Sequence, residues 1–506
     1  MTDLRIEKIY NKLKAEVISE RDANLQLIKA EQLISFCWKN YPLQFSDVDI
    51  ESVLEKNMIS SNQLFDKKNN HIVYVASTLF AVGGHSRCIL NFIDNQPEYQ
   101  HTVILTRQNK SVPTNLTAFF ESKNVDVIIQ DINDLPLSKS VKLLSQVNII
   151  NPQKVYLFQH PDDLVPLMAF GKKSTSLEVV QYSHADHVFS LGLKYFNKQL
   201  EFRNTGALIS HFGKNVNTPQ IQLLPIQNHY ETPNRIEAKK KLGFDSNQRI
   251  VGTLTNFSKA QSFNGFPSLV DVFLKLSEKY TNCVFVIIGL NELEFKSIAG
   301  RAIQIPYNIC CLGIVVNPEP YYETFDFFLE PFPVGSGLGI IEACKHGAVP
   351  IFAPQHARLC STFDVFHVDI QKLLVEATTF DAFYQTIKNY FNILPAEINL
   401  ISEKIKTGIY QYHRGEKWAE NLEKNAFPFE VSHSIEPEVF LKNEALFFQK
   451  YQKKSNAELL EHLISLKQLV SKKLLLSLFL GRNRLFSIFD LNKQNAKRLT
   501  IKFLKS

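Results

Sequence analysis

The sequence contains no hydrophobic run long enough to cross a bilayer, and residues 1–22 are charged throughout. The seven cysteines are an odd number, lie scattered apart from one adjacent pair, and include no CxxC motif. These features argue against a membrane-spanning segment, an export signal, a disulfide framework and a cysteine-based zinc site. We therefore expect a protein of the reducing cytoplasm.

Methionine and tryptophan are scarce, with three and two residues, but the composition is otherwise that of a globular chain, with 45% hydrophobic and 21% charged residues. At 506 residues the chain is too long for one hydrophobic core, so we expect two large domains with extensions. Residues 1–70 lack glycine and carry apolar residues at helical spacing, which predicts a helical extension.

The net charge of +6 is concentrated at the C-terminus. Residues 451–506 hold twelve basic and three acidic residues, an excess of nine, so the rest of the chain carries about −3. Within this tail, residues 457–480 have apolar positions at helical spacing. Two interpretations stay open: a basic amphipathic helix on the inner face of an anionic membrane, or a helix packed on the protein with solvated lysines. The lysine-rich part lacks stacking aromatics, so we do not expect nucleic acid as a partner.

From His71 onward, β-branched runs alternate with helical stretches. HIVYVASTL, HTVILTR, NVDVIIQD and KVYLFQH are each typical of a buried parallel strand. This alternation predicts a doubly wound parallel sheet, whose ligands bind beyond the carboxyl ends of the strands. We therefore expect a crevice formed by residues that follow these strands: Gly83, Gly84, His85, Arg87, Thr106, His160 and Asp162.

Two histidines follow the next predicted strand, in EVVQYSHADH. His184 and His187 flank Asp186, and no further ligand is evident nearby, so a metal site is weakly supported. A histidine at a strand end is often only structural. Because these two lie at the predicted crevice, they are also candidates for acid–base chemistry.

The most informative motif is EPFPVGSGLGIIEACKHG, residues 330–347. Its prolines end a short strand, its glycines leave the backbone bare, and residues 340–345 begin a helix. A bare loop at a helix N-terminus presents unpaired N–H groups to an anion such as phosphate. The alternative is a tight strand-to-helix connection that binds no ligand.

The second half of the sequence repeats the pattern of strands alternating with helical stretches. RIVGTLTNFSK contains a strand followed by Thr255, Asn256 and Lys259, and CVFVIIGL is a buried strand that ends at Gly289. A lysine beside a glycine-rich helix N-terminus is suited to a diphosphate, whose negative charge it would stabilise.

Two Rossmann-like halves with nucleotide signals in the second one resemble the GT-B glycosyltransferases, over about residues 71–425. The turn GGHSR resembles the acceptor-side glycine loop of that fold, and residues 330–352 resemble its donor-nucleotide loop and helix. The donor loop looks most like the O-GlcNAc-transferase and bacterial cytoplasmic N-glycosyltransferase branch. The retaining branch carries two glutamates eight positions apart, but Val334 stands eight positions before Glu342.

The resemblance implies a hexosyltransferase with a nucleotide-sugar as co-substrate, a UDP-sugar being favoured, and a protein or glycan as acceptor. It implies no cofactor and no metal. The helix carboxylate of Glu342 would bind the ribose. The donor-binding set would be Thr255, Asn256, Lys259, Gly289, Gly335, Ser336, Gly337, Leu338 and Glu342. A histidine would act as base, in the order His184, His187, His85.

We predict an α/β protein whose two Rossmann-like domains face a central cleft. The segments are a helical extension over residues 1–70, an acceptor domain over 71–235, a donor domain over 236–430 and a basic helical tail over 431–506. Two other functions stay open: a GT-B epimerase or phosphorylase, and a non-catalytic partner subunit of a glycosyltransferase complex.

Overall fold

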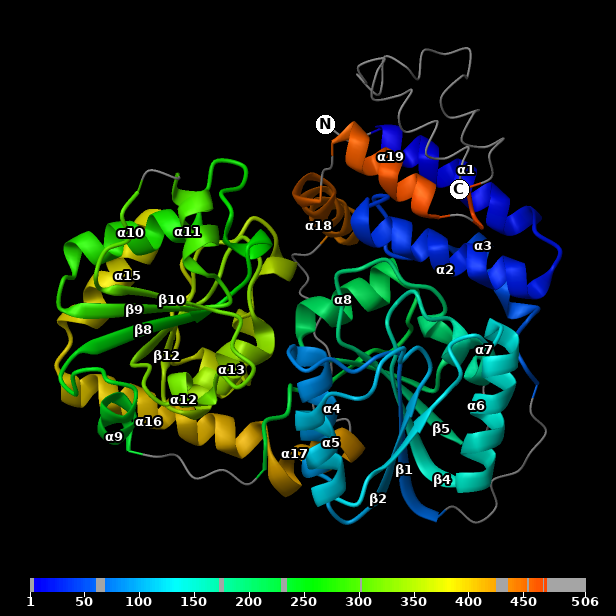
Figure 1. The fold of residues 1–506 in the computed structure, drawn as a ribbon, viewed down its shortest axis with the longest axis horizontal. Helices are drawn as coiled ribbons and strands as arrows, with labels where there is room; N and C mark the ends of the chain where they lie inside the picture. Colours follow the sequence, from blue (N-terminus) through cyan, green and yellow to red (C-terminus); the bar gives the residue numbers. More distant parts are fainter. Residues whose placement is uncertain are drawn as a thin grey trace.

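The computed structural model describes residues 4–60, 69–172, 177–228, 234–300, 303–424, 436–452, 455–466 and 468–470. Within these residues two α/β domains lie side by side, and a layer of helices lies against the first domain (Figure 1). This arrangement confirms the predicted class, α/β with two Rossmann-like domains.

The first domain is built on a seven-stranded sheet in the order β3-β2-β1-β4-β5-β6-β7, in which neighbouring strands are parallel. The strands are β1 (Asn69–Ala76), β2 (Gln100–Leu105), β3 (Asp126–Ile129), β4 (Pro152–Phe158), β5 (Glu178–Ser183), β6 (Lys198–Glu201) and β7 (Gln220–Ile221). Side chains alternate between the two faces of a strand, so the successive β1 residues Tyr74 and Val75 belong to two different hydrophobic cores. The strand order reverses between β1 and β4, so a crevice is expected at their carboxyl ends.

Helices cover both faces of this sheet (Figure 1). They are α4 (Gly84–Asp94), α5 (Thr114–Ser122), α6 (Pro136–Ile150), α7 (Val165–Phe170) and α8 (Asn204–Gly213). Apolar residues of α4 and α5 join the core that contains Tyr74, whereas those of α6 and α7 join the core that contains Val75. Burial on both faces explains why these strands are near-continuous hydrophobic runs.

The second domain has a five-stranded parallel sheet in the order β10-β9-β8-β11-β12. Its strands are β8 (Arg249–Leu254), β9 (Cys283–Ile288), β10 (Ile309–Gly313), β11 (Phe327–Leu329) and β12 (Val349–Ile351). Its helices include α9 (Arg235–Lys241), α10 (Leu269–Lys279), α11 (Glu292–Ala299), α12 (Glu319–Tyr322), α13 (Gly337–Lys345), α14 (Val368–Gln371), α15 (Phe380–Asn392) and α16 (Pro395–Tyr412). Here the order reverses between β8 and β11, which are the strands that precede the two predicted donor motifs.

Helix α17 (Gly415–Lys424) leaves the second domain and packs on the first. Its Trp418 is fully buried, donates from Nε1 to the carbonyl of Leu223 at 2.8 Å, and packs edge-on against Phe92 of α4 at 4.8 Å. The backbone N–H of Gly415 donates to Asn95 Oδ1 at 2.6 Å. The end of the second domain is therefore held on the first.

The helical layer combines both ends of the chain (Figure 1). It contains α1 (Leu4–Ser19), α2 (Ala23–Lys39) and α3 (Val48–Glu55), together with α18 (Pro437–Tyr451) and α19 (Asn456–Ser465). Leu459 and Leu463 of α19 are buried in the same core as Leu27 and Leu33 of α2. The first three helices are the predicted N-terminal helical extension.

The packing of α19 favours the second interpretation of the basic tail for the part that is described, because its apolar face is covered by the protein. Residues 471–506, which carry the rest of the predicted amphipathic segment, lie outside the described residues. No helix in the described ranges combines the length and the hydropathy needed to cross a membrane.

Candidate functional site

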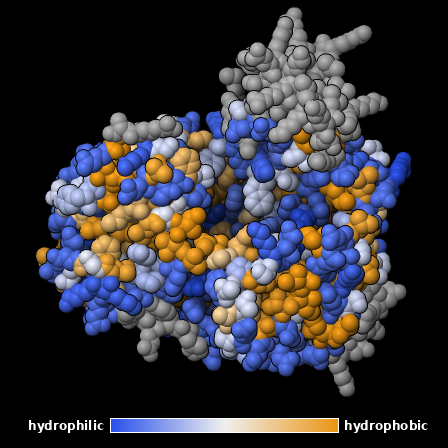
Figure 2. Space-filling model, in the orientation of Figure 1, coloured by the Kyte–Doolittle hydropathy of each residue, from blue (hydrophilic) through white to orange (hydrophobic). Residues whose placement is uncertain are grey.

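The two sheets direct their loops toward a hollow between the domains, which Figure 2 shows from one side with hydrophilic residues around it. On the side of the second domain, the loop after β11 makes a tight turn at Gly335. A methyl group at Gly335 would lie 2.5 Å from Glu330 Oε1 and 2.9 Å from the carbonyl oxygen of Cys360. The glycine is therefore required by this close approach, and its own N–H donates to that carbonyl at 2.8 Å.

Helix α13 begins directly after this turn, at Gly337. Ser336 precedes the helix as its N-cap residue, but its side chain makes no capping hydrogen bond. The first N–H groups of the helix therefore lie at the positive end of the helix dipole without a side-chain cap. This glycine turn followed by a helix start is the local structure on which the predicted anion site depends, and Gly347 follows the helix with a positive φ of 84°.

Lys259, which belongs to the segment after β8, contacts this glycine turn. Its Nζ donates to the carbonyl of Gly335 at 2.8 Å, which places the ammonium beside the start of α13. The lysine is presented by the short helix η2 (Ser258–Ala260), and Asn256 Oδ1 caps this turn by accepting from Ser258 Oγ at 2.7 Å and Lys259 N at 3.0 Å. Burial lowers the pKa of Lys259 from 10.5 to about 8. Asn256 therefore positions the lysine in this structure.

Glu330 is the first residue of the glycine-rich motif, but it was not among the predicted site residues. Its carboxylate is fully buried and accepts from Thr362 N at 2.6 Å and Thr362 Oγ1 at 2.5 Å. Burial raises the pKa of Glu330 to about 7, although the Thr362 hydrogen bonds oppose the shift. The Glu330 side chain packs against Gly335, and its charge interacts favourably with the Lys259 ammonium.

Thr255 and Gly289 lie at the carboxyl ends of β8 and β9, where their backbones touch. A side chain at Gly289, whose φ is 95°, would overlap the carbonyl oxygen of Thr255. Thr255 N donates to the carbonyl of Ile288 at 2.9 Å. Gly289 thus allows the two strand ends to approach, next to the turn that carries Lys259.

Glu342 on α13 faces the first domain and forms an ion pair across the cleft. Its Oε1 lies 3.2 Å from Nε of Arg87 on α4, and Arg87 Nη2 lies 3.6 Å from Glu319 Oε2. Glu319 in turn binds Lys345 Nζ. One arginine of the predicted acceptor turn therefore holds two carboxylates of the second domain.

The turn that contains Gly83 and Gly84 lies close to Leu338 at the start of α13. A methyl group at Gly84 would lie 3.7 Å from Cβ of Leu338, and Gly83 has a φ of 132°, a backbone conformation that glycine favours. The predicted acceptor-side turn and the predicted phosphate loop thus meet at one place, although they are about 250 residues apart in the sequence.

Three histidines gather behind this turn at the ends of β1, β4 and β5. The ring centroid of His85 lies 4.3 Å from that of His184 and 5.5 Å from that of His160. Burial lowers the pKa of each, that of His85 to about 4, so all three are neutral at pH 7. Among the described residues no group of three histidine, cysteine or acidic side chains is arranged to hold a metal ion.

His187 is not part of this cluster. Its ring stacks on Phe448 of α18 at 5.0 Å, and its Nδ1 lies 3.4 Å from Asp186 Oδ1. Asp186 itself is buried and ion-paired to Arg203, with Arg203 Nε at 2.6 Å from Asp186 Oδ2. His187 is thus directed toward the helical layer, away from the other predicted catalytic histidines.

Asp162 pairs with Arg107, whose Nη2 donates to the carbonyl of Asp162 at 2.6 Å. Arg107 also lies 2.7 Å from Glu31 of α2, and Thr106 donates to the buried Asp163. Asp162 and Thr106 are therefore engaged in a network that fixes α2 to the end of the sheet.

No protein-family model matches the sequence, and no curated protein matches it significantly. Solved structures do match. A glycosyltransferase from Rickettsia africae aligns with 71% of this chain and 98% of its own, with a TM-score of 0.53 and 14% identity. The O-GlcNAc transferase of Thermobaculum terrenum aligns with 88% of this chain and 78% of its own, with a TM-score of 0.50 and 12% identity.

The chain has the GT-B fold. At these identities the likeness shows the fold alone, and the branch within GT-B stays a prediction. Each domain contains a strand followed by a glycine turn and a helix start: β1, Gly83 and α4 in the first, and β11, Gly335 and α13 in the second.

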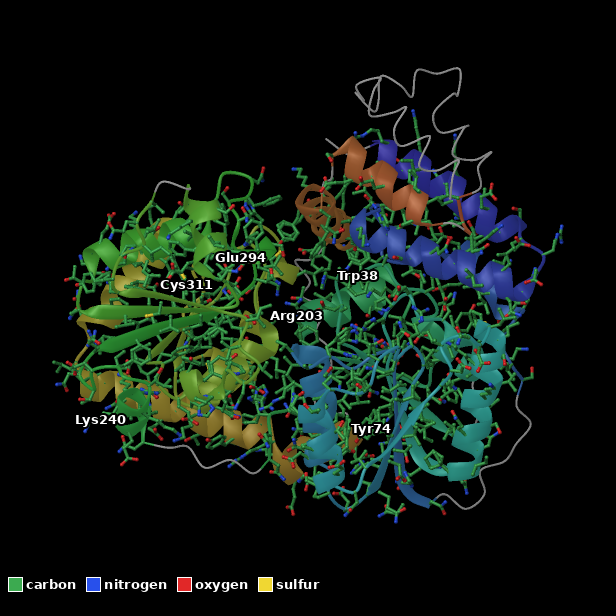
Figure 3. The ribbon with its side chains drawn as sticks, in the orientation of Figure 1. Trp38, Tyr74, Arg203, Lys240, Glu294 and Cys311 are labelled. Atoms are coloured by element: carbon green, nitrogen blue, oxygen red, sulfur yellow. The ribbon has the colours of Figure 1, made fainter. Side chains whose placement is uncertain are left out.

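Two aromatic residues beside the histidine cluster come from segments that the sequence did not connect with it. Trp38 belongs to α2 of the N-terminal extension, yet its ring lies 6.5 Å from that of His160 (Figure 3). Phe80 follows β1 and stacks on His160 at 5.9 Å. Both are partly exposed, with exposed fractions of 38% and 47%. An aromatic surface therefore borders the histidine cluster.

Arg203 lies between the two GT-B domains (Figure 3). It is buried, and besides its ion pair with Asp186 it donates to the carbonyls of Leu359 and Ser361 in the second domain. Asp364 of the second domain accepts from Thr205 N at 2.9 Å. These contacts join the two domains through buried polar groups.

Proposed function

We propose that the protein transfers a sugar from a nucleoside-diphosphate sugar, a UDP-sugar being favoured, to a protein or surface-glycan acceptor. The observation that carries the proposal is the meeting of Lys259 and the start of α13 with the turn that bears His85. The proposal includes contact of residues 471–506 with an anionic membrane surface, because nine basic residues and one acidic residue lie there.

In the proposed reaction an acceptor nucleophile displaces the nucleoside diphosphate from the anomeric carbon. The departing diphosphate gains negative charge, which the Lys259 ammonium and the N–H groups of Gly337 and Leu338 stabilise. Glu342 binds the ribose hydroxyls in place of Arg87. Arg87 then keeps its other ion pair, with Glu319. The diphosphate leaves without a cofactor.

Two of the clustered histidines are arranged to accept the proton of the nucleophile. His85 Nε2 lies 2.6 Å from the carbonyl oxygen of Phe158 and must donate to it, so the lone pair is on Nδ1. Nδ1 of His85 and Nδ1 of His184 are buried without a hydrogen-bond partner among the described residues. Burial keeps both rings neutral at pH 7, so each carries a lone pair, but the same lowering of the pKa makes each ring a weaker base than an exposed histidine.

The experiment that tests the donor site is calorimetric titration of the protein with UDP and with GDP. We expect UDP to bind and the Glu342→Gln variant to bind it about tenfold more weakly, a loss of about 1.4 kcal/mol. Glu292→Gln is the matched control, because Glu292 is exposed on α11 of the same domain. Absence of nucleotide binding in the wild-type protein contradicts the proposal and favours the non-catalytic partner subunit.

The affinity for UDP is expected to fall as the pH rises through about 8. Burial depresses the pKa of Lys259 to about 8, so its ammonium is present below this pH and is lost above it. A diphosphate binds the charged form, so affinity falls by up to about tenfold per pH unit beyond the pKa. Calorimetry between pH 7 and 9.5 measures this, and Lys259→Arg, which stays charged, is expected to give a flat profile.

A further inference from the structure

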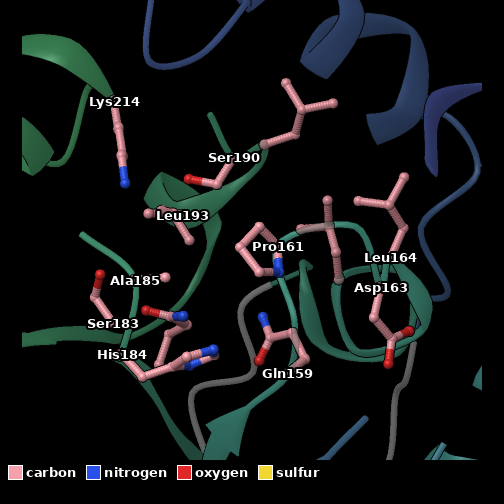
Figure 4. A pocket seen from close by; sticks show the side chains of 13 residues that line it. Gln159, Pro161, Asp163, Leu164, Ser183, His184, Ala185, Ser190, Leu193 and Lys214 are labelled. Carbon is pink, nitrogen blue, oxygen red and sulfur yellow. The ribbon is translucent and has the colours of Figure 1, made fainter. Parts of the chain in front are cut away.

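A polar pocket opens at the carboxyl ends of β4 and β5, beside the histidine cluster (Figure 4). Its polar lining comes from three parts of the first domain: the strand ends, the loop before η1 (Leu193–Tyr195), and the residue after α8. The residues that matter for its chemistry are Gln159, Gln181, His184, Ser190 and Lys214. Neither the donor site nor the proposed proton transfer uses any of them except His184.

Four polar atoms of this lining have no hydrogen-bond partner among the described residues. They are Gln159 Oε1, Gln181 Oε1, His184 Nδ1 and Ser190 Oγ, and each is buried. The exposed fractions of Gln159, Gln181 and Ser190 are 7%, 6% and 6%. Buried polar groups in native proteins are nearly always paired, so four unpaired atoms around one pocket indicate a polar occupant.

The lining selects hydroxyl groups and disfavours anions. Amide oxygens only accept hydrogen bonds, so Gln159 and Gln181 require donors such as O–H groups. The one cation, Lys214, donates to the carbonyl of Asp186 at 2.8 Å and lies near the buried carboxylates of Glu201 and Asp186, which offset its charge. The nearby Asp163 offers no free oxygen, because Ser77 and Thr106 donate to one and Val165 N donates to the other.

The size of the pocket limits the group that enters it. The cavity volume open to the centre of a water molecule is about 20 Å³, and one water needs about 10–15 Å³. A hydroxyl or hydroxymethyl group fits this space, whereas a whole sugar ring does not.

The position of the pocket connects it to the cleft. In Figure 4 the His184 ring points toward the Gln159 amide, and Lys214 extends toward Ala185 from the opposite side. On its other side the ring of His184 lies 4.3 Å from that of His85, which is next to the turn that contacts Leu338 of the donor loop. The pocket and the donor loop are thus connected through two adjacent histidine rings, which is the side from which an exocyclic arm of a sugar in the cleft would enter.

We propose that this pocket receives the hydroxymethyl group of a hexose and thereby selects hexoses over the corresponding pentoses. The inference rests on the proposed function, since it names the sugar class that the same cleft handles. The hydroxyl of the arm donates to an amide oxygen of Gln159 or Gln181 and accepts from Ser190 or Lys214, so both its hydrogen-bonding roles are met. The hexose is either that of the donor or that of the acceptor.

The test compares sugars that differ only by this arm. Donor probes are UDP-glucose against UDP-xylose, and UDP-galactose against UDP-arabinopyranose. Acceptor-side probes are methyl β-D-glucopyranoside against methyl β-D-xylopyranoside, with and without UDP. Binding of each is measured by calorimetry or ligand-observed NMR on the wild-type protein and on Gln159→Leu and Ser190→Ala, the second being the smaller change should the first fail to fold.

We expect the hexose of at least one pair to bind about tenfold or more tightly than its pentose, and the preference to fall below about threefold in both variants. UDP affinity in the variants serves as the control for folding. Discrimination among the UDP-sugars assigns the arm to the donor, and discrimination among the methyl glycosides assigns it to the acceptor. Equal binding within every pair overturns the proposal and leaves ordered water as the occupant. If the protein discriminates between the methyl glycosides but binds no UDP, the pocket proposal is supported and the proposed transferase function is contradicted.

Discussion

Replacing Lys259 with methionine is expected to lower the turnover number for sugar transfer by about 100- to 1000-fold. The ammonium lies at the start of α13, held by the carbonyl of Gly335 at 2.8 Å, where the diphosphate charge develops as the bond to the sugar breaks. Removing one preorganised donor to a developing negative charge has an effect of about this size. Methionine is unbranched and only one atom shorter than lysine, so the apolar part of the side chain keeps most of its packing. Release of UDP from a UDP-sugar under saturating donor measures the turnover number.

The matched control for this substitution is Lys296→Met. Lys296 lies on α11 of the same domain, its side chain is 37% exposed, and it pairs only loosely with Glu292 at 3.8 Å. Its loss is expected to leave turnover unchanged within about twofold, because an exposed ion pair contributes little. A decrease of less than threefold in Lys259→Met would remove Lys259 from the proposed mechanism.

Replacing Trp418 with alanine is expected to lower the free energy of unfolding by about 3–5 kcal/mol. Trp418 is fully buried between α17 and the first domain, where it contacts Phe92 and donates to the carbonyl of Leu223. The substitution leaves a large cavity and an unpaired carbonyl at the segment that returns from the second domain. Urea unfolding followed by circular dichroism measures the loss, since removing a tryptophan compromises fluorescence.

The other tryptophan of the chain is the control. Trp38 is 38% exposed on α2, so Trp38→Ala is expected to cost about 1 kcal/mol or less. Equal losses in the two variants would mean that α17 contributes no more to stability than a surface residue does. Trp418→Phe keeps most of the apolar contact and is expected to be intermediate.

Most of the elements followed from local patterns. The alternating runs predicted β1, β4 and β9, and the glycine-rich motif predicted a helix over residues 340–345, which the structure extends back to Gly337 as α13. These features are local because side-chain periodicity and turn chemistry act over a few residues. The switch points at β1/β4 and β8/β11 then bring the predicted motifs to one cleft.

The assembly of individual side chains was less predictable. His184 and His187 were grouped by their spacing, but only His184 joins His85 and His160, and His187 faces α18 instead. A spacing of three residues beyond a strand end does not determine where the two side chains point, because the backbone of a loop has no regular periodicity. Asn256 was predicted to bind the donor, yet in the structure its side chain caps the turn that carries Lys259.

The sequence by itself determined the fold class, the presence of strands alternating with helices in two domains, and the glycine-rich turn before a helix, because each depends on short-range periodicity, proline and glycine. Only the tertiary structure decided that Arg87 spans the cleft to Glu342, that α19 buries its apolar face beneath the N-terminal helices, and that four unpaired polar atoms surround one pocket. These contacts join residues far apart in the chain, and they exist only once sheet order and helix packing have set the distances between them.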